Sequence, residues 1–177
     1  SATISLEDNS VTRIGNSGGV AFGATQNVSQ DTPDIVGNLR LDQAWGSAQL
    51  MAAAHNNRYK FGDDWGYAVG IGVEIKLPML GAASAIKFSA VHSDGAIEYT
   101  GLSGSSGGAI GGIALGYTNL GGVGGVIVTD SASAINGTNQ LTEGASFMLQ
   151  LRHSWTPQLR SAFHAGYNDA YNVNFAG

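Results

Sequence analysis

Apolar and polar residues alternate over long stretches of this chain. Residues 34–43, DIVGNLRLDQ, place the polar residues Asp34, Asn38, Arg40 and Asp42 on one parity and mostly apolar residues on the other. Successive side chains of a strand point to opposite faces of a sheet, so this pattern predicts a strand with two unlike faces. In a soluble sheet the apolar face would meet a core. In a membrane barrel it would meet lipid, with water inside the barrel.

The alternation recurs along the chain and predicts about seven strands. The predicted strands are 2–7, 34–43, 47–55, 64–77, 84–98, 146–156 and 160–171. Between them, stretches rich in Gly, Ser and Asn predict long loops at about 9–32 and 99–143. The sequence therefore predicts an all-β fold.

The lengths of the connections favour a barrel over a sandwich. Short connections are predicted at 44–46, 78–83 and 157–159, and longer ones at 9–32, 56–63 and 99–143. Outer-membrane barrels alternate short periplasmic turns with longer outside loops in this way, whereas a soluble sandwich has no reason to. We therefore expect a transmembrane antiparallel β-barrel, with residues 1–177 forming a single barrel domain or part of one.

Aromatic residues lie on the apolar parity near the ends of predicted strands. Such rings favour a membrane interface because one end is apolar and the other is wet. The predicted lipid-facing girdle consists of Trp65, Tyr67, Trp155, Phe163 and Tyr167. Aromatic packing within a sandwich core is the alternative, and the pattern leaves it open.

The polar parity is predicted to line a pore, because a charged side chain facing lipid costs about 2–4 kcal/mol at the midplane. The predicted pore-lining residues are Asp34, Asn38, Arg40, Asp42, Glu74, Lys76, Gln150, Arg152 and His164. In a lumen they would order water and favour solutes of suitable charge. Arg40 and Arg152 are the strongest candidates because they lie mid-strand on clean parity. The alternative is the solvated face of an ordinary sheet.

Composition agrees with a barrel and excludes other classes. Charged residues make up 12% of the chain, about half the usual share for a soluble domain. With no Cys, disulfides and thiolate metal sites are excluded, and a net charge of −5 without a basic patch argues against nucleic acid. Mean hydropathy is +0.02, and no apolar run approaches the roughly 20 residues of a membrane helix. Adhesins and secreted β-solenoids share this composition.

No motif for catalysis or metal binding is present. His55, His92, His153 and His164 have no ligand-like spacing, and no GxSxG, HExxH or P-loop pattern occurs. We therefore expect no enzyme activity, no cofactor and no metal site. The rival to a channel is a non-conducting structural or adhesive surface protein.

Several segments resemble the general porins of alphaproteobacteria. These are PDIVGNLRLDQAWGSAQ, DDWGYAVGIGVEIKLPMLG and LRHSWTPQLRSAFHAGY, and SATISLEDNS resembles a mid-chain strand of that family. The resemblance runs to about Asn172, with 101–143 diverging. It implies a 16-stranded barrel, usually a homotrimer, in the lipid and lipopolysaccharide of the bacterial outer membrane. It also implies passive diffusion of small hydrophilic solutes.

The chain departs from that family in having about half its strands. The resemblance implies that residues 1–177 correspond to the second half of a porin without its last strand. The family's inward-folded constriction loop belongs to the other half. Two strand edges would remain unpaired, and lipid contains no water to satisfy them. We therefore expect further strands, a second chain or a small closed barrel, and favour part of a larger porin.

Overall fold

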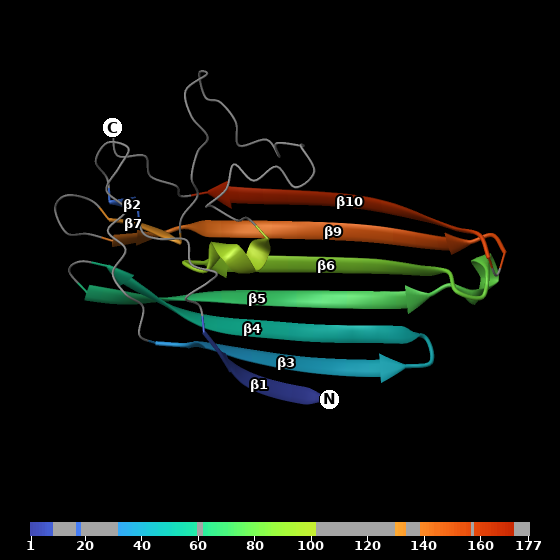
Figure 1. The fold of residues 1–177 in the computed structure, drawn as a ribbon, viewed down its shortest axis with the longest axis horizontal. Coiled ribbons are helices and arrows are strands. Elements are labelled where there is room, and N and C mark those ends of the chain that lie inside the picture. The colour runs from blue at the N-terminus through green and yellow to red at the C-terminus, as the bar shows by residue number, and fades with distance from the viewer. Residues whose placement is uncertain are drawn as a thin grey trace, which may run out of the picture.

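Seven strands form one antiparallel sheet in the order β1-β3-β4-β5-β6-β9-β10 (Figure 1). The computed structural model describes residues 1–8, 17–18, 32–59, 62–101, 130–133, 139–156 and 158–171. The strands are β1 (Ala2–Glu7), β3 (Asp34–Gln43), β4 (Gly46–Tyr59), β5 (Gly62–Lys76), β6 (Ala85–Asp94), β9 (Glu143–Ser154) and β10 (Arg160–Tyr171). The prediction of an all-β fold with about seven antiparallel strands is confirmed. The sheet is not closed, and β1 and β10 lie at its two edges.

Smaller elements lie at the two ends of the sheet. The short strands β2 (Ser17–Gly18), β7 (Ser131–Ser133) and β8 (Asn139–Leu141) form a second sheet. A 3-10 helix, η1 (Pro78–Leu80), follows β5, and a second one, η2 (Ile97–Thr100), follows β6. Among the described residues, no helix has the length and apolar character needed to cross a bilayer.

Two predicted strand boundaries are wrong, both at the end of the sheet opposite the β3–β4 turn. The sequence predicts a strand over 84–98, but β6 ends at Asp94 because Gly95 adopts a left-handed φ of +68° and η2 follows. It also predicts a longer connection at 56–63. Instead β4 and β5 continue to the Tyr59–Gly62 pair, so two residues separate them and the strict alternation of connection lengths fails here. The predicted loops 9–32 and 99–143 lie mostly outside the described residues.

The register gathers apolar side chains on one face of the seven-stranded sheet. One row across all seven strands consists of Ala2, Leu39, Leu50, Ile71, Ala90, Phe147 and Tyr167. Large members of this row are open, with Leu39 56% and Tyr167 62% exposed. Within the described residues, these side chains are therefore not packed in a core of this sheet. A contiguous exposed apolar face is typical of a membrane or interaction surface.

The buried apolar residues are small. Among the described residues they comprise four alanines and Ile97. Three of them, Ala53, Ala68 and Ala96, form one cluster with the partly buried Val36 and Tyr99 packed against it. This cluster lies toward the end of the sheet opposite the β3–β4 turn, on the face opposite the apolar one.

Candidate functional site

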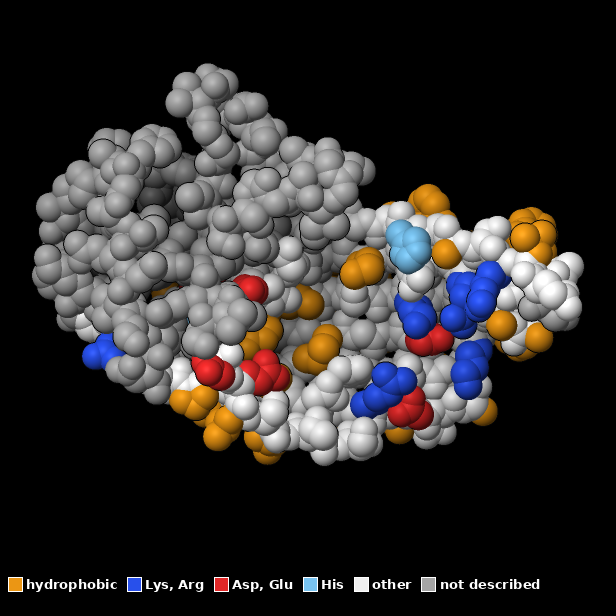
Figure 2. Space-filling model, in the orientation of Figure 1, with side chains coloured by type: hydrophobic (Ala, Val, Ile, Leu, Met, Phe, Trp, Pro, Cys, Tyr) orange, Lys and Arg blue, Asp and Glu red, His pale blue; other side chains and the backbone are white. Residues whose placement is uncertain are grey.

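The second face of the sheet carries most of the charged side chains of the described strands. One row across six strands consists of Asp42, Ser47, Glu74, Lys87, Gln150 and His164. Figure 2 shows Lys and Arg side chains gathered with acidic side chains toward the end of the sheet where β3 turns into β4. We call this half of the polar face the turn end and the opposite half the loop end. Period-two alternation accounts for the gathering, because residues two apart share a face.

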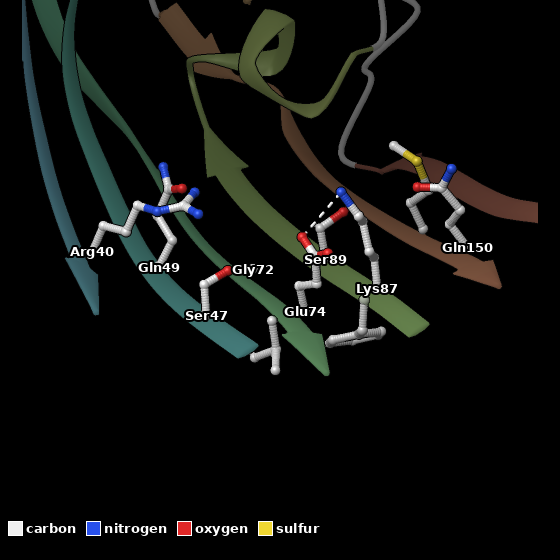
Figure 3. Close-up of a pocket in the computed structure, with 11 residues that line it drawn as sticks. Arg40, Ser47, Gln49, Gly72, Glu74, Lys87, Ser89 and Gln150 are labelled. Atoms are coloured by element: carbon white, nitrogen blue, oxygen red, sulfur yellow. Dashed lines mark ion pairs between the residues drawn. The ribbon is translucent and has the colours of Figure 1, made fainter. Parts of the chain in front are cut away.

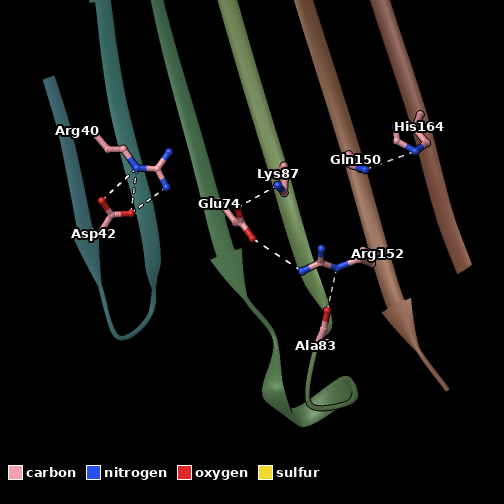
Figure 4. Close-up of polar contacts among 8 residues, drawn as sticks. All are labelled: Arg40, Asp42, Glu74, Ala83, Lys87, Gln150, Arg152 and His164. Atoms are coloured by element: carbon pink, nitrogen blue, oxygen red, sulfur yellow. Dashed lines mark hydrogen bonds and ion pairs between the residues drawn. The ribbon is translucent and has the colours of Figure 1, made fainter. Parts of the chain in front are cut away.

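Glu74 lies at the centre of the turn end and forms ion pairs with two cationic side chains (Figure 4). Lys87 Nζ is 3.1 Å from Glu74 Oε2, and Arg152 Nη2 is 4.0 Å from Glu74 Oε1. Arg152 Nε also donates a hydrogen bond to Ala83 O at 2.9 Å. One carboxylate between two cations leaves positive charge uncompensated. Because these side chains are partly exposed, their pairing is weak and their charges stay available to solutes.

Arg40 is compensated more locally than Arg152. Its Nη2 lies 2.8 Å from Asp42 Oδ1, and its Nε donates to both carboxylate oxygens at 3.0 Å. Both residues belong to β3 and are two positions apart, so they share the polar face. The Arg40 charge is therefore largely balanced by its own strand.

A hollow of about 230 Å³ lies beside these charges (Figure 3). Its lining includes Arg40, Ser47, Gln49, Gly72, Glu74, Lys87, Ser89 and Gln150, from β3, β4, β5, β6 and β9. At Gly72 an added Cβ would meet nothing within 4 Å, so this glycine keeps the hollow open. The polar face is thus concave and lined with hydrogen-bonding groups.

The turn end has an excess of positive charge. We call its charged residues the turn-end cluster. They are Arg40, Lys76, Lys87, Arg152, Arg160, Asp42 and Glu74. Five cations against two anions give an excess of three positive charges on this described surface. A surface of this kind attracts anions.

All nine predicted pore-lining residues lie on the polar face by register. Eight of them lie along its open part: Asn38, Arg40, Asp42, Glu74, Lys76, Gln150, Arg152 and His164. Gln150 Nε2 and His164 Nε2 lie 3.4 Å apart. Asp34 differs, because it is 3% exposed at the loop end. That the open residues line a pore stays a prediction.

The predicted pore-lining set omits Lys87, the cross-strand partner of Glu74, although Lys87 stands out in the sequence as a charged residue on a predicted strand. The signal was present in the alternation of β6, where Ile86, Phe88 and Ala90 are apolar and Lys87 and Ser89 are polar. Reading that parity would have added Lys87 to the polar face.

The predicted girdle residues Trp65, Tyr67, Trp155, Phe163 and Tyr167 are all exposed. Tyr67, Phe163 and Tyr167 belong to the apolar face by register. The Trp155 ring meets the His153 ring edge-on at 4.2 Å, and its Nε1 donates to Ser161 Oγ at 2.9 Å. Their contact with lipid stays a prediction.

At the loop end, residues 95–101 with η2 lie against the polar face. The Ile97 side chain packs onto Gly144, where an added Cβ would overlap it. Ala96 packs against Ala53 and Ala68 of β4 and β5. The absence of a side chain at Gly144 and the small side chains of β4 and β5 allow this close approach.

A buried network of ionisable groups lies beneath this segment. We call Asp34, His55, Tyr99 and Asp130 the loop-end network. Asp34 Oδ1 is 2.8 Å from His55 Nδ1, and Tyr99 O–H donates to Asp34 Oδ2 at 2.8 Å. Asp130 Oδ1 accepts the Ile97 N–H at 2.8 Å, and Asp130 Oδ2 is 3.9 Å from His55 Nε2. Asp34, His55 and Asp130 are each at most 6% exposed.

Burial raises the pKa values of two acidic side chains at the loop end. It raises the pKa of Asp130 to about 6 and that of Glu98 to about 7, with mutual repulsion adding to the effect on Glu98. It also raises the pKa of the Tyr99 hydroxyl, which donates to Asp34. Within the described part of the chain, no three His, Asp or Glu side chains are placed to hold a metal ion.

Comparison with known proteins adds a family. A model of a porin subfamily matches residues 1–175, and so covers every strand described above. No curated protein and no solved structure matches the chain.

Proposed function

The chain belongs to this porin family. From that premise we propose that it forms part of the wall of a water-filled outer-membrane channel, through which small hydrophilic solutes and ions diffuse passively. Proteins of this family are non-enzymatic channels of the membrane-embedded β-barrel type. The observation that carries the proposal is the contrast between the two faces of one sheet. The apolar face is exposed, as a lipid-facing wall must be, and the polar face is hollow and charged.

The open edges support a barrel larger than seven strands. Backbone N–H and C=O groups on the outer edges of β1 and β10 need partners in lipid, because no water reaches them there. We propose that further strands close the wall into a barrel of 16 strands in the bacterial outer membrane. The 16 strands, a homotrimer and contact with lipopolysaccharide rest on the family resemblance.

The turn-end cluster supports a preference for anionic solutes. Lys87 and Arg152 share one carboxylate, and Lys76 and Arg160 add further positive charge. Charges fixed on a pore wall select solutes by sign when the pore is narrow compared with the screening length, about 8 Å at physiological salt. We propose that Lys87 and Arg152 contribute more to selectivity than Arg40, whose charge Asp42 balances.

Planar-bilayer recording of the native protein tests both parts of the proposal. The expected result is single-channel steps, with a reversal potential in a salt gradient that indicates anion preference. The double variant Lys87→Gln/Arg152→Gln should shift that potential toward cations. Arg58→Gln, which removes one cation near the loop end of β4, is the matched control and should not shift it. A protein that inserts but gives no steps would instead be structural or adhesive.

A further inference from the structure

The loop-end network has no role in a wall that only separates lipid from water. Burying ionisable groups is unfavourable unless each is paired or hydrogen-bonded. Three of the four groups here are nevertheless almost fully buried, and their contacts converge on residues 95–101. These contacts hold the segment on the polar face. If that face lines the pore, a segment held there reduces the open cross-section of the pore.

Residues 95–101 are held at their start as well as through the network. Asn57 Nδ2 donates to Gly95 O at 2.6 Å, and the Gly95 N–H donates to Thr142 O at 2.9 Å. Gly95 is left-handed, which turns the chain out of β6 and back over the sheet. Residues 95–101 are therefore fastened to the wall both at Gly95 and through the contacts of Ile97 and Tyr99.

We propose that residues 95–101 form a latched constriction at the loop end of the pore, fastened to the wall by the loop-end network and released when that network loses protons. The proposal rests on the channel function proposed above. The constriction is formed by residues of the chain itself, so the proposal needs no bound ligand. Asp34 and Asp130 act as positioning residues, since they hold Tyr99 and the Ile97 N–H.

The titratable groups that face residues 95–101 lie mainly in the cavity beneath η2. The cavity under η2 is about 120 Å³ and is lined by Glu7, Asp34, His55, Ala96, Glu98, Tyr99 and Asp130. The contacts from β5 and β9 include Gly66, Ala68 and Gly144, none of which titrates. Asp94, the last residue of β6, pairs directly with Tyr67 and so belongs to the other face.

The sign follows from the raised pKa values of Glu98 and Asp130. Each carboxyl binds its proton more tightly while the segment is fastened than after release into water. Their contribution to fastening is therefore complete below the ordinary carboxyl pKa and is lost as pH rises through about 7. Above that, Glu98 and Asp130 are anions beside Asp34, and repulsion favours release.

The test is single-channel conductance of the native protein between about pH 5 and about pH 8. We expect a low conductance at the acidic limit and a higher one at the alkaline limit, with a midpoint between about 6 and about 7. Steps whose size is independent of pH would overturn the latch and leave the channel intact. Absence of steps at every pH would overturn the channel proposal as well.

Two conservative variants should move the midpoint in opposite directions. Glu98→Gln keeps a neutral group in place, so low conductance should persist to higher pH. Tyr99→Phe removes the hydrogen bond to Asp34 and should lower the midpoint by about one pH unit, a tenfold change in the latch equilibrium. Tyr171→Phe is the matched control: it removes a hydroxyl near His92 and should change nothing. Equal shifts in all three variants would contradict the proposal.

A reversible lock provides an independent check, because the chain has no cysteine. The Cγ1 atom of Ile97 lies 3.5 Å from the position of a Cβ on Gly144, so Ile97→Cys with Gly144→Cys brings two thiols within bonding reach. Oxidised, this pair should hold the low conductance at all pH values, and reduction should restore the pH response. Conductance that rises with pH in the oxidised protein would overturn the latch.

Discussion

Asp34 and Asp42 lie on the same strand and the same face, but in different surroundings. Asp42 is exposed at the turn end and pairs with Arg40 two residues away. Asp34 is 3% exposed at the loop end and contacts His55 and Tyr99, which are far from it in the sequence. What differs is the cover that residues 95–101 provide. Alternation thus decides which face a side chain occupies, while cover decides whether the side chain meets water.

The largest expected effect is on the unfolding free energy, when the buried Asp34 is replaced and the result is compared with replacement of the exposed Asp42. Asp34→Ala removes the carboxylate that contacts the buried His55 and accepts a hydrogen bond from the partly buried Tyr99, and should cost about 3–5 kcal/mol of unfolding free energy. Asp42→Ala is the matched control on the same strand and should change that free energy little, because water solvates the freed Arg40. Urea unfolding in lipid vesicles measures both. Equal losses would mean that the loop-end network is not buried.

The next effect tests the two faces that both ends share. Leu39→Arg puts a charge on the apolar face and should cost about 2–4 kcal/mol near the bilayer midplane. Its neighbour Asn38→Arg puts the same charge on the polar face and should be tolerated. Folding yield and unfolding free energy in vesicles compare the pair. A larger penalty at Asn38 would reverse the assignment of the faces.

A smaller effect sharpens the contrast through pH. Amide exchange of residues 95–101, corrected for its intrinsic pH dependence, should be faster at about pH 8 than at about pH 6, because Glu98 and Asp130 then carry charge. The turn-end halves of β5 and β6, residues 71–76 and 85–90, contain no buried acid and should show no corrected change. Equal acceleration at both ends would indicate general loosening rather than release of the segment.

The smallest expected effect concerns Arg40. Arg40→Gln leaves Asp42 as an unpaired anion, which should shift selectivity slightly toward cations. Arg152→Gln should shift it further, because Glu74 remains paired with Lys87 and the turn-end cluster loses a positive charge that no carboxylate of its own strand balances. Reversal potentials of the two single variants decide the order. A larger shift for Arg40→Gln would give Arg40 the leading role.

The strands and their faces follow from local pattern, and so were predictable. The polar and apolar positions of β3, β5 and β9 depend only on period-two alternation, which holds within one strand. The loop-end network was not predictable in this way, because Asp34 and Asp42 look alike in the pattern. Its contacts join β3 and β4 to Tyr99 and Asp130, and no local signal marks such pairs. Gly95 did mark the end of β6, in a stretch that otherwise continues the strand pattern.

The most direct test of the account is a cysteine scan along β5 from Ile71 to Ile75 in lipid vesicles, in a chain with no cysteine of its own. A membrane-impermeant, water-soluble thiol reagent should label cysteines at positions 72 and 74. Positions 71, 73 and 75 should react only with a lipid-soluble reagent, because their side chains face the bilayer. That alternation would establish a lipid-facing and a water-facing side of the same strand. Equal labelling of both parities by the water-soluble reagent would contradict the channel wall.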